Sequence, residues 1–313
     1  MRKTILVLTA ACLLMNALAG VVRAGPIEDA IVAYGRGDYA TTLRILQPLA
    51  DNGDQLAQLG LGDLYVFGQG VAPDNVAAMK WYRKAAEQGS AVAQYNVGAI
   101  HAFGQGVPQD NVAAMTWYRK AADQGVALAQ YSLGALFDKG EGIPQDYRAA
   151  AKWYRMAADQ GNALAQYALG ILYVKGHGVP RDNAEAVKWY GKAADQGIAE
   201  AQYNAGVIYA FGEGVAQNFA AAAKWYQMAA DQGFVLAQRN IGLMYYQGEG
   251  RPKDYVQAHK WLSVAATRTP AGKAALRDIT VRNRDLVESK MTATQIAEAQ
   301  KLAREWKPKQ VEK

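Results

Sequence analysis

The residues that could carry chemistry in this 313-residue chain are few and stand apart from one another. The three histidines are His101, His177 and His259, and no pair of them has an H-x-x-x-H or similar metal-ligand spacing. The single cysteine, Cys12, lies in the N-terminal apolar run, so the rest of the chain offers no thiol nucleophile. There is no G-x-S-x-G motif and no phosphate loop ending in G-K-[ST]. We therefore predict no catalytic residue, no metal site and no cofactor.

Each histidine also has an ordinary structural interpretation. His101 occupies a position that holds Tyr or Phe in most of the related segments, so packing is expected. His177 lies in a loop, and His259 takes a helix position otherwise filled by Met, Ala or Val, which predicts partial burial. "GQGVPQD" contains G-x-G but lacks the third glycine and a preceding strand, so it is interpreted as a turn. Most Asp fall at helix starts or in the recurrent "DQG", and no pair of carboxylates is singled out.

The N-terminus predicts export. Met1-Arg2-Lys3 precedes the apolar run "TILVLTAACLLM" and small residues, the pattern of a signal peptide over residues 1–24. Cleavage is expected after Ala24, where a helical pattern begins, with Ala19 as the alternative. The run is too short for a good membrane span, and Thr9 stands where a lipid anchor on Cys12 would need a leucine-like residue. The mature protein is thus predicted to be periplasmic or secreted, without disulfides or a transmembrane segment.

Composition and charge limit the partners. A charged fraction of 20% and a hydrophobic fraction of 51% are typical of a folded protein. Loss of three basic residues with the signal peptide lowers the net charge from +6 to +3. Because nucleic-acid binding requires a clustered basic face, which the interspersed charges do not indicate, no nucleic-acid partner is predicted.

The elements that would have to position any site are repeated. "WYRKAADQG" at Trp117 returns nearly unchanged at Trp153 and Trp189, and a constant interval of 36 residues predicts stacked helix pairs. One copy has a first helix over 90–102, a glycine-rich loop and a second helix over 110–124. The tryptophans are interpreted as large core side chains between helices, and they are Trp81, Trp117, Trp153, Trp189, Trp225 and Trp261.

Glycine and Asp recur at positions that explain the folding of each unit. Loop glycines allow the positive φ that ends a helix, and Asp or Asn caps the second helix. A further glycine stands in the middle of each first helix, at a cost of about 1 kcal/mol relative to alanine. This cost predicts close helix–helix contact at Gly98, Gly134, Gly170 and Gly206, and at the equivalent Gly62 and Gly242.

The repeated pattern "AQ…G…G.GV..D…A..WY.KAA.QG" resembles the Sel1-like repeat, a relative of the tetratricopeptide repeat. The resemblance covers residues 54–266 in six copies. It implies an all-α, right-handed α-solenoid of stacked antiparallel helix pairs with a concave face, in proteins that usually act as adaptors. Residues 25–53 are expected to form an N-terminal capping helix pair (27–34 and 38–50). Residues 267–313 are expected to form a C-terminal helical cap and tail, with helices over 274–289 and 293–306.

The resemblance also places a binding surface. In tetratricopeptide proteins the first helices line the concave face, with the residues two and three before the mid-helix glycine pointing inward. Asparagine amides there could hold a peptide backbone, tyrosines could add contact area, and Arg239 could meet a carboxylate. The alternative is that the tyrosines only pack between repeats. The candidate residues are Tyr95, Asn96, Tyr131, Ser132, Tyr167, Tyr203, Asn204, Arg239 and Asn240.

The predicted function is therefore an exported, non-catalytic adaptor that binds a protein or peptide partner on its concave face. Two alternatives stay open: an envelope-acting enzyme of β-lactam or peptidoglycan chemistry, and a secreted or surface factor that binds a host protein. The partner's identity and the oligomeric state do not follow from the sequence.

Overall fold

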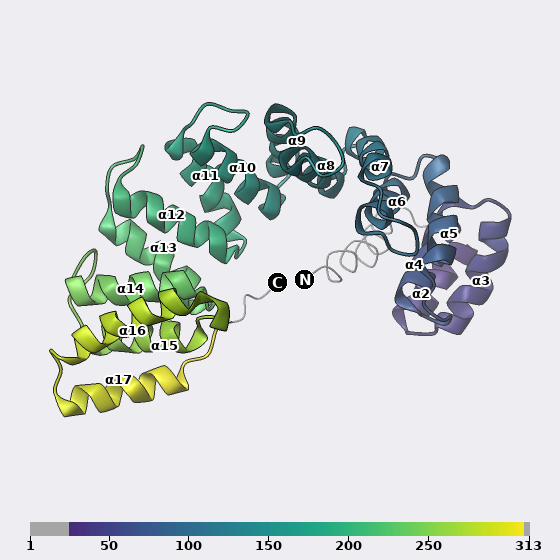
Figure 1. Ribbon diagram of the computed structural model, residues 1–313. Helices are drawn as coiled ribbons and strands as arrows, with labels where there is room; N and C mark the ends of the chain where they lie inside the picture. Colours follow the sequence, from purple (N-terminus) through teal and green to yellow (C-terminus); the bar gives the residue numbers. More distant parts are fainter. Residues whose placement is uncertain (1–24, 310–313) are drawn as a thin grey trace. The chain divides into compact units, whose positions relative to one another are not determined.

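The computed structural model describes residues 25–309. All regular secondary structure in this part of the chain is helical, and loops connect the helices (Figure 1). It consists of two compact units, residues 25–160 and residues 161–309. Both predicted cleavage sites, and the tail from 310 onward, lie outside the described residues.

Helix pairs follow one another along both units. Unit 1 contains α2 (Pro26–Gly35), α3 (Tyr39–Asp51), α4 (Gln55–Phe67), α5 (Asn75–Glu87), α6 (Ala91–Phe103), α7 (Asn111–Asp123), α8 (Ala127–Lys139) and α9 (Tyr147–Asp159). Unit 2 contains α10 (Ala163–Lys175), α11 (Asn183–Asp195), α12 (Ala199–Phe211), α13 (Phe219–Asp231), α14 (Val235–Gln247), α15 (Tyr255–Arg268), the 3-10 turn η1 (Ala271–Lys273), α16 (Ala274–Glu288) and α17 (Ala293–Glu305). Even-numbered helices from α4 to α14 are the first helices of the repeats. The prediction of stacked helix pairs is confirmed.

The predicted caps form as expected. Asp110 begins α7, and its carboxylate accepts hydrogen bonds from the backbone N–H groups of Val112 and Ala113, both at 2.9 Å. Asn218 caps α13 in the same way, because its Oδ1 accepts a hydrogen bond from the backbone N–H of Ala221 at 2.9 Å. Each first helix ends at a left-handed glycine such as Gly104, whose φ of 63° an L side chain adopts only with strain. Local chemistry therefore sets the start of every second helix and the end of every first helix.

In the first five repeats the mid-helix glycine admits the tyrosine that follows the tryptophan, rather than the tryptophan itself; in the sixth repeat Gly242 admits Leu262. A Cβ atom built on Gly98 would lie 2.7 Å from Cδ1 of Tyr118, and one on Gly206 would lie 2.7 Å from Cδ1 of Tyr226. Such distances exclude any side chain at these glycines. The predicted close contact is confirmed, and it explains why the recurring pair is Trp-Tyr and not Trp alone.

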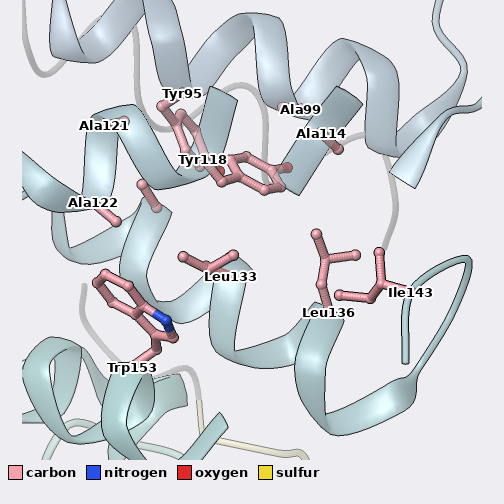
Figure 2. Close-up of a cluster of buried hydrophobic side chains, with 11 residues drawn as sticks. Tyr95, Ala99, Ala114, Tyr118, Ala121, Ala122, Leu133, Leu136, Ile143 and Trp153 are labelled. Carbon is pink, nitrogen blue, oxygen red and sulfur yellow. The ribbon is translucent and has the colours of Figure 1, made fainter. Parts of the chain in front are cut away.

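The tryptophans fill the space between neighbouring repeats. Figure 2 shows Trp153 beside Ala121 and Ala122 of the repeat before it and beside Leu133 of its own repeat. Trp153 is buried, as are Trp189 and Trp261, whereas the other three repeat tryptophans are half-buried. The interpretation as large core side chains is confirmed for the three buried tryptophans. The three half-buried ones, Trp81, Trp117 and Trp225, pack with one face against a cluster of buried residues.

Two glutamines per repeat form a hydrogen-bonded connection between neighbouring repeats. Gln94 is buried in α6 and donates to the carbonyl oxygen of Ala86 in the preceding repeat at 3.1 Å. Gln124, from the "DQG" at the end of α7, donates to Oε1 of Gln94 at 2.8 Å and to the carbonyl oxygen of Gly89 at 3.0 Å. Gln202 and Gln232 make the equivalent bond at 2.8 Å in unit 2. These contacts explain why glutamine recurs in both "AQ" and "DQG".

Helices flank the repeats at both ends, α2 and α3 before the first repeat and α16 and α17 after the last. At the start of α17, Thr292 and Gln295 form a capping box. Trp306, just beyond α17, meets Trp261 edge to face at a centroid distance of 5.9 Å. The last repeat is therefore covered by an aromatic contact from the cap.

Candidate functional site

The first helices present the candidate residues, but with unequal exposure. In unit 1, Tyr95 and Asn96 are buried, with 3% and 2% of their surface exposed. Tyr131 and Ser132 are half-buried. In unit 2 every candidate is half-buried: Tyr167, Tyr203, Asn204, Arg239 and Asn240. We call the exposed side of α10, α12 and α14 the first-helix face. Tyr95 and Asn96 offer almost no surface to a partner, which is a correction to the predicted set.

The tyrosines of this face pack inside their own repeats. Tyr167 on α10 lies against Tyr190 on α11 with ring centroids 5.8 Å apart, and Tyr203 on α12 lies against Tyr226 on α13 at 5.7 Å. Tyr95 with Tyr118 and Tyr131 with Tyr154 repeat this arrangement in unit 1. The packing role that was the alternative interpretation is thus present, and only the outer edge of each half-buried ring is left for a partner.

Asparagines link the two tyrosine pairs of unit 2 to the next repeat. Asn240 on α14 interacts with the hydroxyl groups of both Tyr203 and Tyr226. Burial raises the pKa of Tyr226 to about 12, and the interaction with Asn240 offsets part of this rise. Asn204 has the same relation to Tyr167 and Tyr190. The amides of Asn204 and Asn240 therefore have a structural role. A partner could use only the donors and acceptors that these contacts leave unoccupied.

Two equivalent pockets open beside these asparagines in unit 2. The first, of about 330 Å³, lies between α10 and α12 and is lined by Ile171, Val174, Lys175, Tyr190, Asn204, Val207 and Ile208. The second, of about 200 Å³, lies between α12 and α14, and its lining includes Phe211, Tyr226, Asn240, Leu243 and Met244. Tyr190, Asn204, Val207 and Ile208 each return 36 residues later in the second pocket as Tyr226, Asn240, Leu243 and Met244. Each pocket thus has apolar walls together with one asparagine and one tyrosine, and its polar edge adds Lys175 in the first pocket and Gln247 and Glu249 in the second.

Two residues beside the pockets have unsatisfied surface: Phe211 is highly exposed, and Arg239 has no carboxylate partner in the described part of the chain. Phe211 lines the second pocket with 70% of its surface exposed, the highest value among the exposed large apolar residues of the described chain. Arg239 stands where the other repeats from the second onward carry Tyr, and its buried Nε has no hydrogen-bond partner. Among residues 25–309 no carboxylate lies within 4 Å of Arg239; its Nη1 reaches only Oδ1 of Asn240, at 3.4 Å. An aromatic side chain and a cation without a counter-ion are common features of recognition surfaces.

Asp63 is a departure from the repeat that the sequence analysis missed. Its position holds Ala99, Ala135, Ile171, Val207 and Leu243 in the other repeats. The hydroxyl of Tyr82 donates to Oδ1 of Asp63 at 2.6 Å, while Oδ2 is buried without a partner. Burial raises the pKa of this carboxyl to about 7, and the hydrogen bond from Tyr82 opposes the rise. An acidic residue at a repeat position that is otherwise apolar was the sequence signal that could have revealed this buried carboxyl group.

The histidines have separate surroundings. His259 is buried rather than partly buried, with its Nε2 2.9 Å from Oε2 of Glu288 on α16. His101 and His177 are half-buried. Across the described range no group of three or more His, Cys, Asp or Glu side chains is arranged to hold a metal ion. Nor does this range contain a helix long and apolar enough to cross a membrane.

Comparison with known proteins agrees with this geometry. The model of the Sel1 repeat family matches six consecutive segments: 55–90, 91–126, 127–162, 163–198, 199–234 and 235–269. The chain therefore belongs to the Sel1 repeat family. Members of this family are usually non-catalytic scaffolds, and Sel1 repeats typically mediate protein interactions. No curated protein matches the chain at a significant level.

Two solved structures are similar to this chain over most of its length. One is a protective antigen of uropathogenic Escherichia coli with a Sel1-like repeat fold; it is 36% identical, with a TM-score of 0.75 over 88% of this chain. This chain spans only 59% of that protein. The other is a Sel1 repeat protein from Oxalobacter formigenes, 34% identical, with a TM-score of 0.65 over 77% of this chain and 98% of its own.

Proposed function

We propose that this protein is an exported, non-catalytic adaptor that binds an extended segment of a protein partner on its first-helix face. The observation that carries the proposal is the pair of equivalent pockets in unit 2, each with an apolar wall and an asparagine. A partner with apolar side chains at matching intervals would fill both pockets. The general role of Sel1 repeats in protein interactions supports the same conclusion.

The chemistry of the face suggests how a partner is held. The amides of Asn204 and Asn240 can each donate to and accept from a peptide backbone. Phe211 offers a large apolar contact at the rim of the second pocket. Arg239 lacks a carboxylate partner, so an acidic side chain or a C-terminal carboxylate of the partner would pair with it.

The test is affinity capture with paired variants. Phe211→Ala is expected to lower retention of the partner by at least about tenfold, since a well-buried aromatic anchor contributes 2 kcal/mol or more. Phe103→Ala is the matched control, because Phe103 stands three repeats earlier at the same position and is 43% exposed. If both variants retain the partner as well as the unchanged protein does, binding lies elsewhere and the proposal fails.

The asparagines are tested separately. Asn204→Ala combined with Asn240→Ala should weaken the same partner while the thermal unfolding midpoint reports the loss of their interactions with tyrosine. A parallel double variant with serine keeps a hydroxyl at both positions, as Ser132 does naturally. Recovery of folding without recovery of binding would assign the amides to the partner.

Export is part of the proposal and rests on residues 1–24. Cell fractionation, followed by mass spectrometry of the N-terminus, would give a mature chain starting at Gly25 or, with the alternative site, at Gly20. A cytoplasmic protein that keeps Met1 would contradict it.

A second candidate is a surface or secreted factor that binds a host protein. It is favoured by the 36% identity to a protective antigen of uropathogenic Escherichia coli. The binding face would be the same, so localisation on intact cells separates this candidate from a periplasmic adaptor. Labelling by an antibody before the cells are permeabilised would support the surface factor.

A further inference from the structure

Charge is distributed unevenly along the chain. Residues 267–309 contain ten basic and five acidic side chains, a net charge of +5. Residues 25–266 contain 20 basic and 22 acidic side chains, a net charge of −2. The positive charge of the protein is thus concentrated in residues 267–309, which contain η1, α16 and α17 and which we call the C-terminal cap.

One side of α16 is apolar and uncovered. Thr280 and Val287 are its buried residues, and Val287 packs with α15. Ile279 and Leu286 lie seven residues apart, on a different side of the helix, and are 40% and 50% exposed. Ala275, four residues before Ile279, is exposed on the same ridge.

Cations accompany this ridge. Arg282 lies between Ile279 and Leu286 on the same side of α16, and Lys290 follows Leu286 by four residues. Lys273 and Arg277 are exposed nearby. Within the described residues none of these four cations has a carboxylate within 4 Å; the ion pairs of α16 are Arg284 with Asp285 and Glu288 with His259. Asp278 is the remaining acid of α16, so the unpaired charges of this region are predominantly positive.

We propose that the C-terminal cap docks on an anionic lipid surface, with α16 lying in the membrane interface. Ile279 and Leu286 would enter the boundary between headgroups and acyl chains, while Arg282 and Lys290, which accompany the same ridge, would meet lipid phosphates. An interfacial helix needs this combination of an apolar side and neighbouring cations, because the cations are attracted to anionic headgroups.

Two other occupants fit the ridge less well. A second copy of the chain would bring Arg282 and Lys290 against their own equivalents, and like charges repel. A specific protein partner usually buries an anchor side chain in a pocket. Both pockets described above lie between first helices, and neither includes a residue of the cap. An exposed convex ridge suits a fluid surface, and this docking is separate from the binding proposed for the first-helix face.

Vesicle sedimentation tests the proposal on the protein recovered after secretory expression, with one N-terminus verified for all variants. The unchanged protein should sediment with vesicles containing phosphatidylglycerol and stay free of pure phosphatidylcholine vesicles, and added salt should weaken binding. Ile279→Ser with Leu286→Ser should lower the partition coefficient at least about tenfold, because both apolar contacts are lost. Arg282→Gln with Lys290→Gln should lower it by a similar factor and reduce its dependence on salt.

Matched variants outside the cap keep the test specific. Val112→Ser removes an apolar side chain that is 53% exposed on α7, and Lys152→Gln with Lys224→Gln removes two exposed cations from second helices. Both should bind vesicles like the unchanged protein, and circular dichroism melts should show that all variants fold. Absence of binding to anionic vesicles, or equal losses in cap and control variants, would overturn the proposal. Retention on immobilised polyglutamate through the same cap residues, without vesicle binding, would also overturn it and would assign the cap to an acidic polypeptide.

Discussion

The two units use the same 36-residue template and differ in what they place between consecutive first helices. Between α4 and α6, unit 1 buries the carboxyl group of Asp63, held by the hydroxyl of Tyr82. Three repeats later, the position of Asp63 is taken by Ile171, which lines an open apolar pocket between α10 and α12. The glycine–tyrosine packing beneath is the same in both units. A repeat protein can therefore keep its core packing constant while the side chain at one repeat position changes from an acid to an apolar residue.

The largest expected effect concerns the pH dependence of unit 1. Because the pKa of Asp63 in the folded protein, about 7, lies above its ordinary value, the folded state holds a proton that the unfolded chain releases. The free energy of unfolding should therefore fall as the pH rises from about 4 to about 7, by up to about 4 kcal/mol, and stay level above. Denaturant unfolding across this range measures it.

Asp63→Asn should abolish this slope and make the protein more stable than the unchanged chain at pH 8. Asp123→Asn, at the exposed end of α7, is the control and should leave the slope in place. A slope that persists in Asp63→Asn would show that another group causes it.

The shared core is tested by overfilling it in each unit. Gly98→Val and Gly206→Val should each lower the free energy of unfolding by about 3 kcal/mol, because the new Cβ would overlap the ring of Tyr118 or Tyr226. Equal losses, measured by urea denaturation, would confirm that the two units share this contact. A loss confined to one unit would show that the template is not equivalent.

The glutamine connection should have an intermediate effect. Gln124→Ala leaves Oε1 of Gln94 and the carbonyl oxygen of Gly89 without their donor, which is expected to cost about 2 kcal/mol. Gln232→Ala in unit 2 removes the equivalent bond to Gln202. Hydrogen exchange of the neighbouring helix ends would locate the loss; unchanged protection in both variants would refute the role of these side chains.

The smallest expected effect is an increase in stability on replacing Gly191. Gly191 lies inside α11 where the repeats of unit 1 carry Arg, and a Cβ there would meet no atom within 4 Å. Gly191→Ala should therefore raise the free energy of unfolding by up to about 1 kcal/mol through helix propensity. Thermal melts suffice to measure the change, and a decrease would mean that Gly191 is needed for a contact absent from this structure.

Much of the fold was predictable because its signals are local. Asp110 caps its helix through atoms two and three residues away, and Gly104 ends one by its own backbone angle. A strict period of 36 then repeats every such signal, which is why helix bounds could be predicted to within a residue or two. The first-helix face was predictable only in part, since a resemblance places it but does not say which members are exposed.

Sequence alone thus determined the repeat, its turns, its caps and the family, because these depend on short-range backbone geometry and on periodicity. Tertiary structure decided which aromatic enters each glycine gap, that Tyr95 and Asn96 are buried while Asn204 lines a pocket, and that Asp63 meets Tyr82. It also joined His259 to Glu288 across 29 residues. The physical reason is that exposure and partner choice depend on residues brought together by stacking, and one repeat read by itself contains no information about its neighbour's side chains.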